Sequence, residues 1–598
     1  MTLTGRIKEV ASQALQHLFP GTGIEPSMVS VNQTKPEFSG DYTVVLFPFV
    51  KLLKLKPDEL GRRLGEHLVG MEGSIFTAYQ VVSGFLNLSV SDSEWLFFLS
   101  RTAGRDDLAP HAATGKKVMV EYSSPNTNKP LHFGHLRNIF LGYAMGEVLK
   151  ATGNDVVKAN LINDRGIHIC KSMIAWQRTA NGATPESAEI KGDHLVGDYY
   201  VRFNDIYKAE VKELVAAGME EAVAGKEAPI MKDAQEMLVK WEAGDPDVRE
   251  LWRRMNGWVY EGFEVSYKKL GVDFDKMYYE SDTYLLGKEI VERGLEKGVL
   301  FKKENGSVWI DLTADGLDEK LLLRGDGTSV YITQDLGTAV LKYNDFKLDQ
   351  SIYVIADEQN YHMQVLKLIL QKLGEPCADG IFHLSYGMVE LPTGKMKSRE
   401  GTVVDADDMM EEMVRLSKEQ TEQAGKTEGF TEAELAELYE MIGMGALKFY
   451  LLRVDPKKKM IFDPKESIDL HGFTATFIQY AHARICSILR KEGVSYNDYQ
   501  PAPLTLTSEI APAEKRLILA LEQYASVLDA AADEYNPSLL CNYSFHLAQL
   551  FNSFYDVHSI SKAESEEKKL LRLMIIVLTA HTLRSAMQLL GIRLPEKM

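Results

Sequence analysis

The sequence contains few cysteines, and they form no metal-binding pair. Four occur in 598 residues, Cys170, Cys377, Cys486 and Cys541, and no two of them make a CxxC motif. We therefore expect neither a structural zinc site nor a disulfide framework. Reduced thiols are typical of an intracellular protein, so we predict a cytoplasmic location.

Long apolar runs are also missing. The longest, such as VVLFPFV and LMIIVL, are too short to cross a bilayer. The N-terminal segment MTLTGRIKEVASQALQHLF carries Lys8 and Glu9, where a signal peptide needs an unbroken apolar core. We therefore expect no membrane association.

Positive charge is in deficit over the whole chain, because 67 lysines and arginines stand against 85 acidic residues, for a net charge of −18. This balance argues weakly against nucleic-acid binding unless basic residues gather locally. They do so between Lys448 and Lys491, where nine basic residues stand against four acidic ones, with aromatic residues between them. The segment predicts a phosphate-facing surface, although many of its aromatic rings could equally be helix core.

The length predicts several domains, since a single core does not grow to this size. Residues 1–110 have the pattern of a small α+β unit. Over 111–405, strand-like segments alternate with helices, which predicts a parallel α/β sheet with helices on both faces. These segments are KKVMVEYSS, DVVKANLIND, GSVWIDLT, SVYITQD, SIYVIADEQ and IFHLSYGMV. A charged helical insertion is expected at about 175–270, a helical connection over 406–464 and an all-α bundle over 465–598.

The segment SSPNTNKPLHFGHLRN, residues 123–138, joins a predicted strand to a predicted helix. Helix N-termini at the carboxyl ends of parallel strands bind anions. Gly134 lets a ligand approach closely, His132 and His135 can donate hydrogen bonds to a phosphate, and Lys129 adds a full positive charge. An isolated HxGH is more often a loop with two structural histidines, but the strand–turn–helix context favours a phosphate site.

A second basic segment, GKMKSREGTVVD, covers residues 394–405. Alone, such a segment is usually a solvated loop. In this order the two segments resemble the two signatures of class I aminoacyl-tRNA synthetases, and SSPNxxKPxHxGHLR resembles arginyl-tRNA synthetases in particular. The resemblance implies a Rossmann-type catalytic domain that uses ATP and substrate-bound Mg²⁺. It implies catalytic roles for His132, Gly134, His135, Lys129 and Lys395, and ATP contacts from His132, His135, Lys129, Lys395, Met396, Lys397 and Ser398.

One position departs from the class pattern. Ser398 stands where the class usually has its second lysine, which would leave the phosphate charge short of one cation. Arginyl enzymes commonly lack that lysine, and the resemblance implies that Lys129, just before the HxGH motif, takes over its role.

Recognition of arginine needs carboxylates and planar acceptors, because a guanidinium presents five N–H donors. Tyr331 and Asp335 are four residues apart, the spacing of one helical turn. The resemblance implies that Asp335 pairs with the guanidinium and that Tyr331 covers it. Taken singly, Tyr331 could be sheet core, Asp335 a helix N-terminal charge and Gln359 a loop hydrogen-bond partner. The implied arginine-binding residues are Ser124, Pro125, Asn126, His135, Tyr331, Asp335, Gln359, Glu121 and Glu280.

The ends of the chain resemble the tRNA-binding parts of the same family. QYAHAR and LLGIRLPEKM resemble the helical anticodon-binding domain, and the unit around SGDYTVVL, residues 39–46, resembles an additional tRNA-binding domain. The resemblance implies tRNA(Arg), L-arginine and ATP as partners, activation that depends on bound tRNA, and no resident metal. We expect a monomer. The implied tRNA contacts are Lys457, Lys458, Lys459, Tyr480 and Arg484.

Three alternatives remain open on the sequence. The chain could be another class I synthetase, such as a cysteinyl or glutamyl type, but it lacks zinc-ligand clusters. It could be a small-molecule nucleotidyltransferase, which would not need a basic helical C-terminal domain. It could also be a non-catalytic tRNA-binding paralogue, against which the intact His132, His135 and Lys129 argue.

Overall fold

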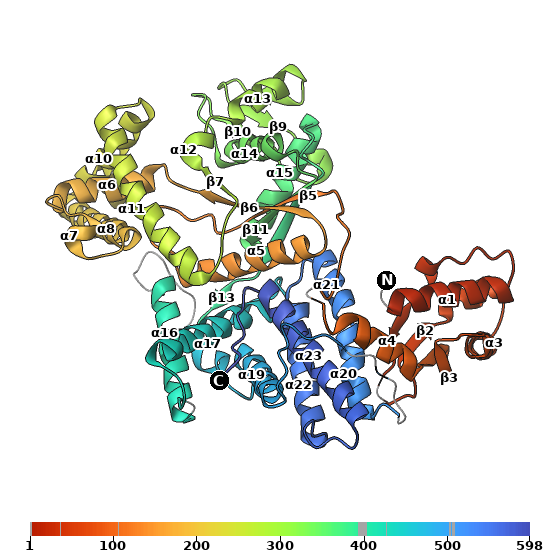
Figure 1. Cartoon of the computed structure of the whole chain (residues 1–598). Coiled ribbons are helices and arrows are strands. Elements are labelled where there is room, and N and C mark those ends of the chain that lie inside the picture. The colour runs from red at the N-terminus through yellow and green to blue at the C-terminus, as the bar shows by residue number, and fades with distance from the viewer. Residues whose placement is uncertain are drawn as a thin grey trace.

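The computed structural model describes residues 3–35, 37–105, 107–392, 404–425, 427–501, 504 and 509–598. The centre of the described chain is a five-stranded parallel sheet of order β12-β11-β5-β6-β7 (Figure 1). Its strands are apolar over most of their length because both faces are covered, which confirms the predicted α/β sheet. The strands are β5 (Lys117–Glu121), β6 (Asp155–Ile162), β7 (Lys276–Tyr279), β11 (Gln350–Ala356) and β12 (Ile381–Tyr386).

Helix α5 (Phe133–Ala151) follows β5 and lies buried against the sheet. Two of its polar side chains are also buried, and each bonds to backbone groups. Asn138 accepts from the N–H of Ser123 at 2.6 Å and donates to the carbonyl of Val354 at 2.6 Å. Arg137 donates to the carbonyl of Lys458 at 2.8 Å. The start of α5 is thereby held against the turn after β5, the strand β11 and the C-terminal region.

A helical lobe stands between β6 and β7 in the chain, at one side of the sheet (Figure 1). Its helices pack closely where glycine leaves room: a Cβ on Gly192 would lie 2.1 Å from the carbonyl oxygen of Trp258. The helices are α6 (Ile167–Thr179), α7 (Pro185–Ala188), α8 (Gly192–Ala216), α9 (Glu221–Glu227), α10 (Pro229–Glu242) and α11 (Pro246–Leu270).

A second, smaller lobe lies between β7 and β11 in the chain, and here two sequence predictions are wrong. GSVWIDLT forms β9 (Val308–Ile310), which belongs to a separate antiparallel sheet with β8 (Leu300–Lys302) and β10 (Lys320–Leu323). SVYITQD is not a strand, because helix α14 begins at Tyr331. The helices here are α12 (Glu280–Thr283), α13 (Gly287–Glu296), α14 (Tyr331–Phe346) and α15 (Asn360–Leu373), with 3₁₀ turns η2 (Thr313–Asp315) and η3 (Asp357–Gln359).

The N-terminal unit is a small α+β structure beside the C-terminal bundle (Figure 1). Its antiparallel sheet has the order β1-β2-β4-β3. The unit contacts the bundle through Glu522, which accepts from the Tyr42 hydroxyl and from the N–H of Leu3. The elements are α1 (Leu3–Leu18), η1 (Pro26–Met28), β1 (Val31–Gln33), β2 (Tyr42–Val45), α2 (Phe47–Leu53), α3 (Pro57–Gly70), β3 (Phe76–Val82), β4 (Phe85–Val90) and α4 (Asp92–Thr102).

The C-terminal part is almost entirely helical, as predicted. A short parallel pair, β13 (Val389–Glu390) with β14 (Met460–Ile461), joins it to the region of the parallel sheet. The helices are α16 (Ala406–Gln423), α17 (Glu432–Leu452), α18 (Pro464–Ser467), α19 (Ala475–Lys491), α20 (Pro512–Glu522), α21 (Tyr524–Asp533), α22 (Ser538–Val557) and α23 (Glu566–Leu589).

Helix α23 is the one described helix that is long and apolar enough to cross a membrane by length and composition. Its most apolar window is 78% buried inside the protein, where it packs against α19, α20 and α22. The LMIIVL run that the helix contains therefore serves as bundle core. The four cysteines are buried, free thiols.

Candidate active site at the carboxyl edge of the sheet

Several of the predicted site residues lie at the carboxyl edge of the parallel sheet. Strand β5 leads into Ser124, Pro125 and Asn126, β7 into Glu280, and β11 into Gln359. Since parallel strands end at one edge, this geometry brings segments from three parts of the chain to one side of the sheet.

The turn after β5 has an unusual backbone. Ser123 and Ser124 both have positive φ, 76° and 45°, a region that serines rarely occupy. Hydrogen bonds hold it there: the N–H of Ser124 donates to Asn160 at 3.0 Å, and Ser123 Oγ lies 2.7 Å from the Tyr267 hydroxyl. This strained turn leaves the Asn126 side chain exposed and sets where the following motif begins.

Lys129, His132 and His135 lie together at the N-terminus of α5. The two imidazole ring centres are 3.8 Å apart, and the backbone N–H of His132 donates to Nδ1 of His135 at 3.0 Å. Lys129 Nζ lies 3.5 Å from Nε2 of His132. A Cβ on Gly134 would lie 3.0 Å from the His132 ring, so glycine is the residue that leaves this ring uncrowded.

The protonation of these rings follows from their partners. An ammonium only donates, so Nε2 of His132 accepts and its proton sits on Nδ1. Among the described residues that buried Nδ1 has no hydrogen-bond partner. A buried polar atom without a partner is costly, and a phosphate oxygen that entered this cluster would supply the missing partner.

Burial lowers every pKa in this cluster. It brings the pKa of His132 to about 4, with a smaller contribution from Lys129. Burial, then the neighbouring His132 and Lys129, hold the pKa of His135 well below its usual value, and burial also lowers the pKa of Lys129. At neutral pH both imidazoles are neutral donors. A bound phosphate anion would raise all three pKa values, because it favours the charged forms.

The second signature falls largely outside the described residues, which include none of Lys395, Met396, Lys397 and Ser398. Its last two residues, Val404 and Asp405, are described, and this part of the chain lies against the first signature. The N–H of Phe133 donates to the carbonyl of Val404 at 2.9 Å, and the N–H of Ala406 donates to the carbonyl of Leu131 at 3.0 Å. Residues from the two predicted signatures are thus neighbours in space.

Acidic side chains gather on the other side of the site. Tyr331 and Asp335 lie one turn apart on α14, and Asp335 Oδ2 is 2.6 Å from Nε2 of His362. Burial raises the pKa of Glu280 to about 7, and the negative charge of Asp335 contributes to the rise. Tyr331 is 82% exposed, so its ring is available to cover a ligand. A cluster of this kind suits a cationic group.

Glu121 has a structural partner. It ends β5 and forms a buried ion pair with Lys342 of α14, whose ammonium also lies 4.6 Å from the centre of the Tyr353 ring. This contact ties α14 to the sheet. The role of Glu121 in arginine binding stays a prediction.

Sequence reasoning missed two residues of this edge. Asn163 and Asp164 follow β6, and the N–H of Thr127 donates to the Asn163 carbonyl at 3.1 Å, so Asn163 lies beside Asn126. Asp164 is buried and accepts from Tyr260 at 2.8 Å and from Ser281 Oγ at 2.7 Å. The signal was available: NDRG directly follows the strand-like DVVKANLI, and polar residues at that position belong to the site edge.

The predicted tRNA contacts fall in two places. Lys457, Lys458 and Lys459 are exposed in the turn before β14. Because Arg137 of α5 bonds to the Lys458 carbonyl, this turn lies against the catalytic region. Tyr480 and Arg484 lie on α19 of the bundle, where the guanidinium is 4.8 Å from the tyrosine ring centre and donates to Asn552 at 3.1 Å.

Part of the predicted basic surface is buried or already paired. Lys448 is buried and donates to the carbonyl of Gly591, and burial lowers its pKa to about 7. Arg453 bonds to Glu466 at 2.8 Å and lies 3.7 Å from the Tyr450 ring centre. The aromatic residues Phe449, Tyr450 and Phe462 are core. The exposed positive charge of this segment is therefore smaller than the sequence count.

Comparison with known proteins agrees with this architecture. Residues 101–463 match the family model described as tRNA synthetases class I (R), catalytic domain, and residues 478–598 match the DALR anticodon binding domain. Those matches, on a parallel sheet with an HxGH at a helix N-terminus, make the chain a class I tRNA synthetase.

Similar proteins of known activity identify the family within class I to which the chain belongs. The chain is 51% identical to the arginine–tRNA ligase of Bacteroides thetaiotaomicron, over 97% of each chain, and 49% identical to that of Porphyromonas gingivalis, over the whole of both. The fold is that of the arginyl-tRNA synthetase of Thermus thermophilus, with a TM-score of 0.79, 24% identity and full coverage of both chains. The chain belongs to the arginyl-tRNA synthetase family and is an arginine–tRNA ligase. The predicted recognition and activity are confirmed, and the alternative families are excluded.

Proposed function

We propose that the carboxyl edge of the sheet is where ATP activates L-arginine and where tRNA(Arg) then receives it. The observation that carries the proposal is the buried, unpartnered Nδ1 of His132 beside His135 and Lys129, at the N-terminus of α5. Three donors and a helix N-terminus suit one phosphate group. The acidic cluster around Asp335 and Glu280 stands at the same edge and suits a guanidinium.

In the activation step, a carboxylate oxygen of arginine attacks the α-phosphorus of ATP. The bond to the bridging oxygen breaks, pyrophosphate leaves, and arginyl-adenylate forms. No protein nucleophile is needed, so positioning and electrostatic stabilisation supply the rate. His132, His135 and Lys129 donate to the oxygens of the pentavalent phosphate. Lys395, Met396, Lys397 and Ser398, outside the described residues, complete the phosphate side in this proposal.

Magnesium fits this scheme as an ion carried by ATP. When bound it neutralises charge on the pyrophosphate. Within the described residues one cluster has the spacing to hold an ion, His194 with Asp405 and Asp407. The Lys191 ammonium already pairs with Asp407. A resident metal is therefore not part of the proposal.

Arginine selection would rest on charge and shape. Asp335 pairs with the guanidinium, Tyr331 covers it, and Glu280 and Gln359 border it. Ser124, Pro125 and Asn126 face the substrate backbone from the turn after β5, together with His135. In the second step a hydroxyl of the terminal tRNA ribose attacks the adenylate carbonyl, and AMP leaves.

The tRNA would contact several parts of the chain. We place it along the N-terminal unit (1–110), the exposed Lys457, Lys458 and Lys459, and the bundle (465–598) with Tyr480 and Arg484. The catalytic domain (111–405, with its insertion at about 175–270) and the connection (406–464) lie between these ends in the chain. We further propose a cytoplasmic monomer that requires bound tRNA for activation.

The test is ATP–pyrophosphate exchange with each of the twenty amino acids, with and without total tRNA. Exchange with arginine alone, and only in the presence of tRNA, is the expected result. Exchange with arginine in the absence of tRNA would contradict the proposed tRNA requirement but would leave the site assignment unchanged. Exchange with a different amino acid would overturn the pocket assignment.

A further inference from the structure

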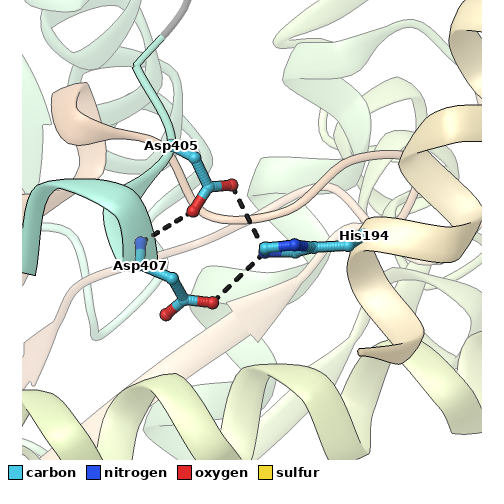
Figure 2. Close-up of side chains that lie close together, drawn as sticks. All are labelled: His194, Asp405 and Asp407. Atoms are coloured by element: carbon cyan, nitrogen blue, oxygen red, sulfur yellow. Dashed lines mark hydrogen bonds and ion pairs between the residues drawn. The ribbon is translucent and has the colours of Figure 1, made fainter. Parts of the chain in front are cut away.

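A charged network joins the helical lobe to the chain after the second signature (Figure 2). The imidazole of His194, on α8, points between two carboxylates at the start of α16. Its Nε2 lies 3.4 Å from Oδ2 of Asp405 and 3.2 Å from Oδ2 of Asp407. One histidine thus contacts both acidic residues.

Lys191, one turn earlier, adds a permanent charge to the network. Its ammonium pairs with Asp407, lies 3.1 Å from the buried Asp193, and donates to Ser266 Oγ of α11 at 2.6 Å. Ser266 donates in turn to Asp407 at 2.9 Å. Because Lys191 already pairs with Asp193 and Asp407, the network is an ion-pair connection between α8, α11 and α16.

On its other side, Asp405 is tied to the first signature. Its backbone lies opposite His132, in the bridge formed by the bonds from Phe133 to Val404 and from Ala406 to Leu131. Its side chain accepts from the N–H of Asp407 at 2.7 Å and caps α16. His194 is therefore linked to the backbone of His132 through a single residue, Asp405.

Helix α8 also contacts the same loop directly, one turn beyond His194. A Cβ on Gly197 would lie 2.7 Å from Cδ of Pro130 and 3.6 Å from Cα of Lys129. Only glycine allows so close an approach. The helical lobe thus contacts the phosphate-binding segment directly at Lys129–Pro130, and it is linked to the backbone of His132 through Asp405.

We propose that His194 and Lys191 are positioning residues for arginine activation: by holding Asp405 and Asp407 to α8, they keep His132 and Lys129 in the geometry that the phosphate needs. The inference rests on the proposed role of His132. Neither residue touches the reacting atoms, so their contribution appears in the rate of activation rather than in the affinity for arginine.

The network also gives the rate a pH dependence. The charged groups facing His194 are Asp405 and Asp407 at the start of α16, Lys191 just before α8, and Asp193 and Asp198 on α8 itself. Lys129 stands on the loop against Gly197, and α11 contributes the uncharged Ser266. The Asp407 carboxylate, 3.2 Å from Nε2, raises the pKa of His194 against the opposing effect of burial. As pH rises through this raised value, His194 loses its charge, its hold on the carboxylates weakens, and the rate falls.

The experiment compares His194→Gln, His194→Lys and Lys191→Met in tRNA-dependent ATP–pyrophosphate exchange across about pH 6 to pH 9. For His194→Gln and Lys191→Met we expect kcat to fall roughly ten- to a hundred-fold, with the KM for arginine nearly unchanged. The alkaline fall in rate should vanish in His194→Gln. His194→Lys keeps the charge, so it should recover most of the rate and move the fall to higher pH. Lys212→Met, an exposed lysine on the same helix, is the matched control.

A wild-type kcat and pH profile in His194→Gln would overturn the inference. An equal loss in His194→Gln and His194→Lys, accompanied by a lower melting temperature, would also overturn it, because the role would then be structural only.

His132→Ala separates this inference from the proposed function. If His132→Ala keeps normal exchange, the assignment of His132 is wrong, and the inference falls with it. If His132→Ala loses exchange while His194→Gln does not, only the inference fails. When both hold, His194→Gln should cause a smaller loss in the His132→Ala background than in wild type, because one of the two groups that it positions is then already absent.

Discussion

His362 and Asp335 form a 2.6 Å hydrogen bond between α15 and α14. Asp335 is the residue proposed to pair with the arginine guanidinium. The protein therefore already supplies a partner to this carboxylate. A substrate that brings its own five donors must share or displace that partner.

The arginine KM should depend on pH through this pair. The hydrogen bond with Asp335 raises the pKa of His362 above its usual value. Below the raised value His362 is charged and competes with arginine for Asp335; above it the ring is neutral and the carboxylate is available. The KM for arginine should therefore fall as pH rises from about 6 to about 8.5, measured by exchange at saturating ATP and tRNA.

Glu280 loses its proton in the same range, since its pKa is about 7, and acts in the same direction. His362→Gln and Glu280→Gln should each flatten part of the profile, and the double variant should flatten most of it. A KM profile in His362→Gln that matches wild type would show that the hydrogen bond has no part in arginine binding.

The Asp335 charge itself should dominate selectivity. Asp335→Asn keeps the shape and one acceptor but removes the charge, and a hydrogen bond to a charged group contributes about 1.5–3 kcal/mol. We expect the KM for arginine to rise roughly ten- to a hundred-fold, with ATP and tRNA binding unchanged. Asp345→Asn, on the last turn of the same helix, controls for the substitution. Normal arginine kinetics in Asp335→Asn would place the guanidinium elsewhere.

The spacing of Tyr331 and Asp335 predicted one helical turn between them, and both lie on the first turns of α14. Their place in an arginine pocket was implied by the family resemblance and stays a prediction. SVYITQD nevertheless reads as a strand, because its β-branched and aromatic residues favour one, while contacts with the rest of the lobe decide the helix. The His362 partner could not be predicted, because α14 and α15 meet only in the folded chain.

Lys129 should matter to the transition state more than to binding. Its ammonium lies beside His132, and it is the proposed substitute for the lysine that Ser398 replaces. Lys129→Ala should remove about 2–4 kcal/mol of transition-state stabilisation, the usual contribution of one such donor. Single-turnover formation of arginyl-adenylate, with quantified tRNA binding as the check on folding, measures this directly.

Lys150→Ala, at the other end of α5, is the matched control for Lys129→Ala. A near-normal single-turnover rate in Lys129→Ala would mean that the lysines of the KMKSRE segment, and not Lys129, stabilise the phosphate in the transition state.

Charge counting along the sequence could not separate core from surface. Lys448 was counted in the basic segment that predicted a phosphate-facing surface, yet it is buried beside Gly591. Lys457, Lys458 and Lys459 entered as part of the C-terminal tRNA-binding region, yet their turn lies against α5. Both outcomes depend on packing between segments far apart in the chain, which local composition does not encode.

The family resemblance implies that Glu121 binds arginine, whereas the structure shows Glu121 in an ion pair with Lys342. Its ion pair with Lys342 is almost fully buried, with side-chain exposures of 8% and 1%. Removing one partner of such a pair leaves an uncompensated charge and costs about 3–5 kcal/mol. Lys342→Met should lower the thermal stability accordingly, whereas Glu121→Gln combined with Lys342→Met should recover much of it. Lys232→Met, which breaks an exposed pair with Glu227, should change stability by less than about 1 kcal/mol.

The same variants decide the role of Glu121. If the role of Glu121 is structural, the stable double variant should keep a near-normal KM for arginine, because the sheet and α14 remain in contact without the ion pair. If Glu121 instead binds arginine, the KM for arginine should rise in Glu121→Gln whether or not Lys342 is changed, because the carboxylate that is lost is one that contacts the substrate. Equal stability in wild type and Lys342→Met would contradict the buried pair itself.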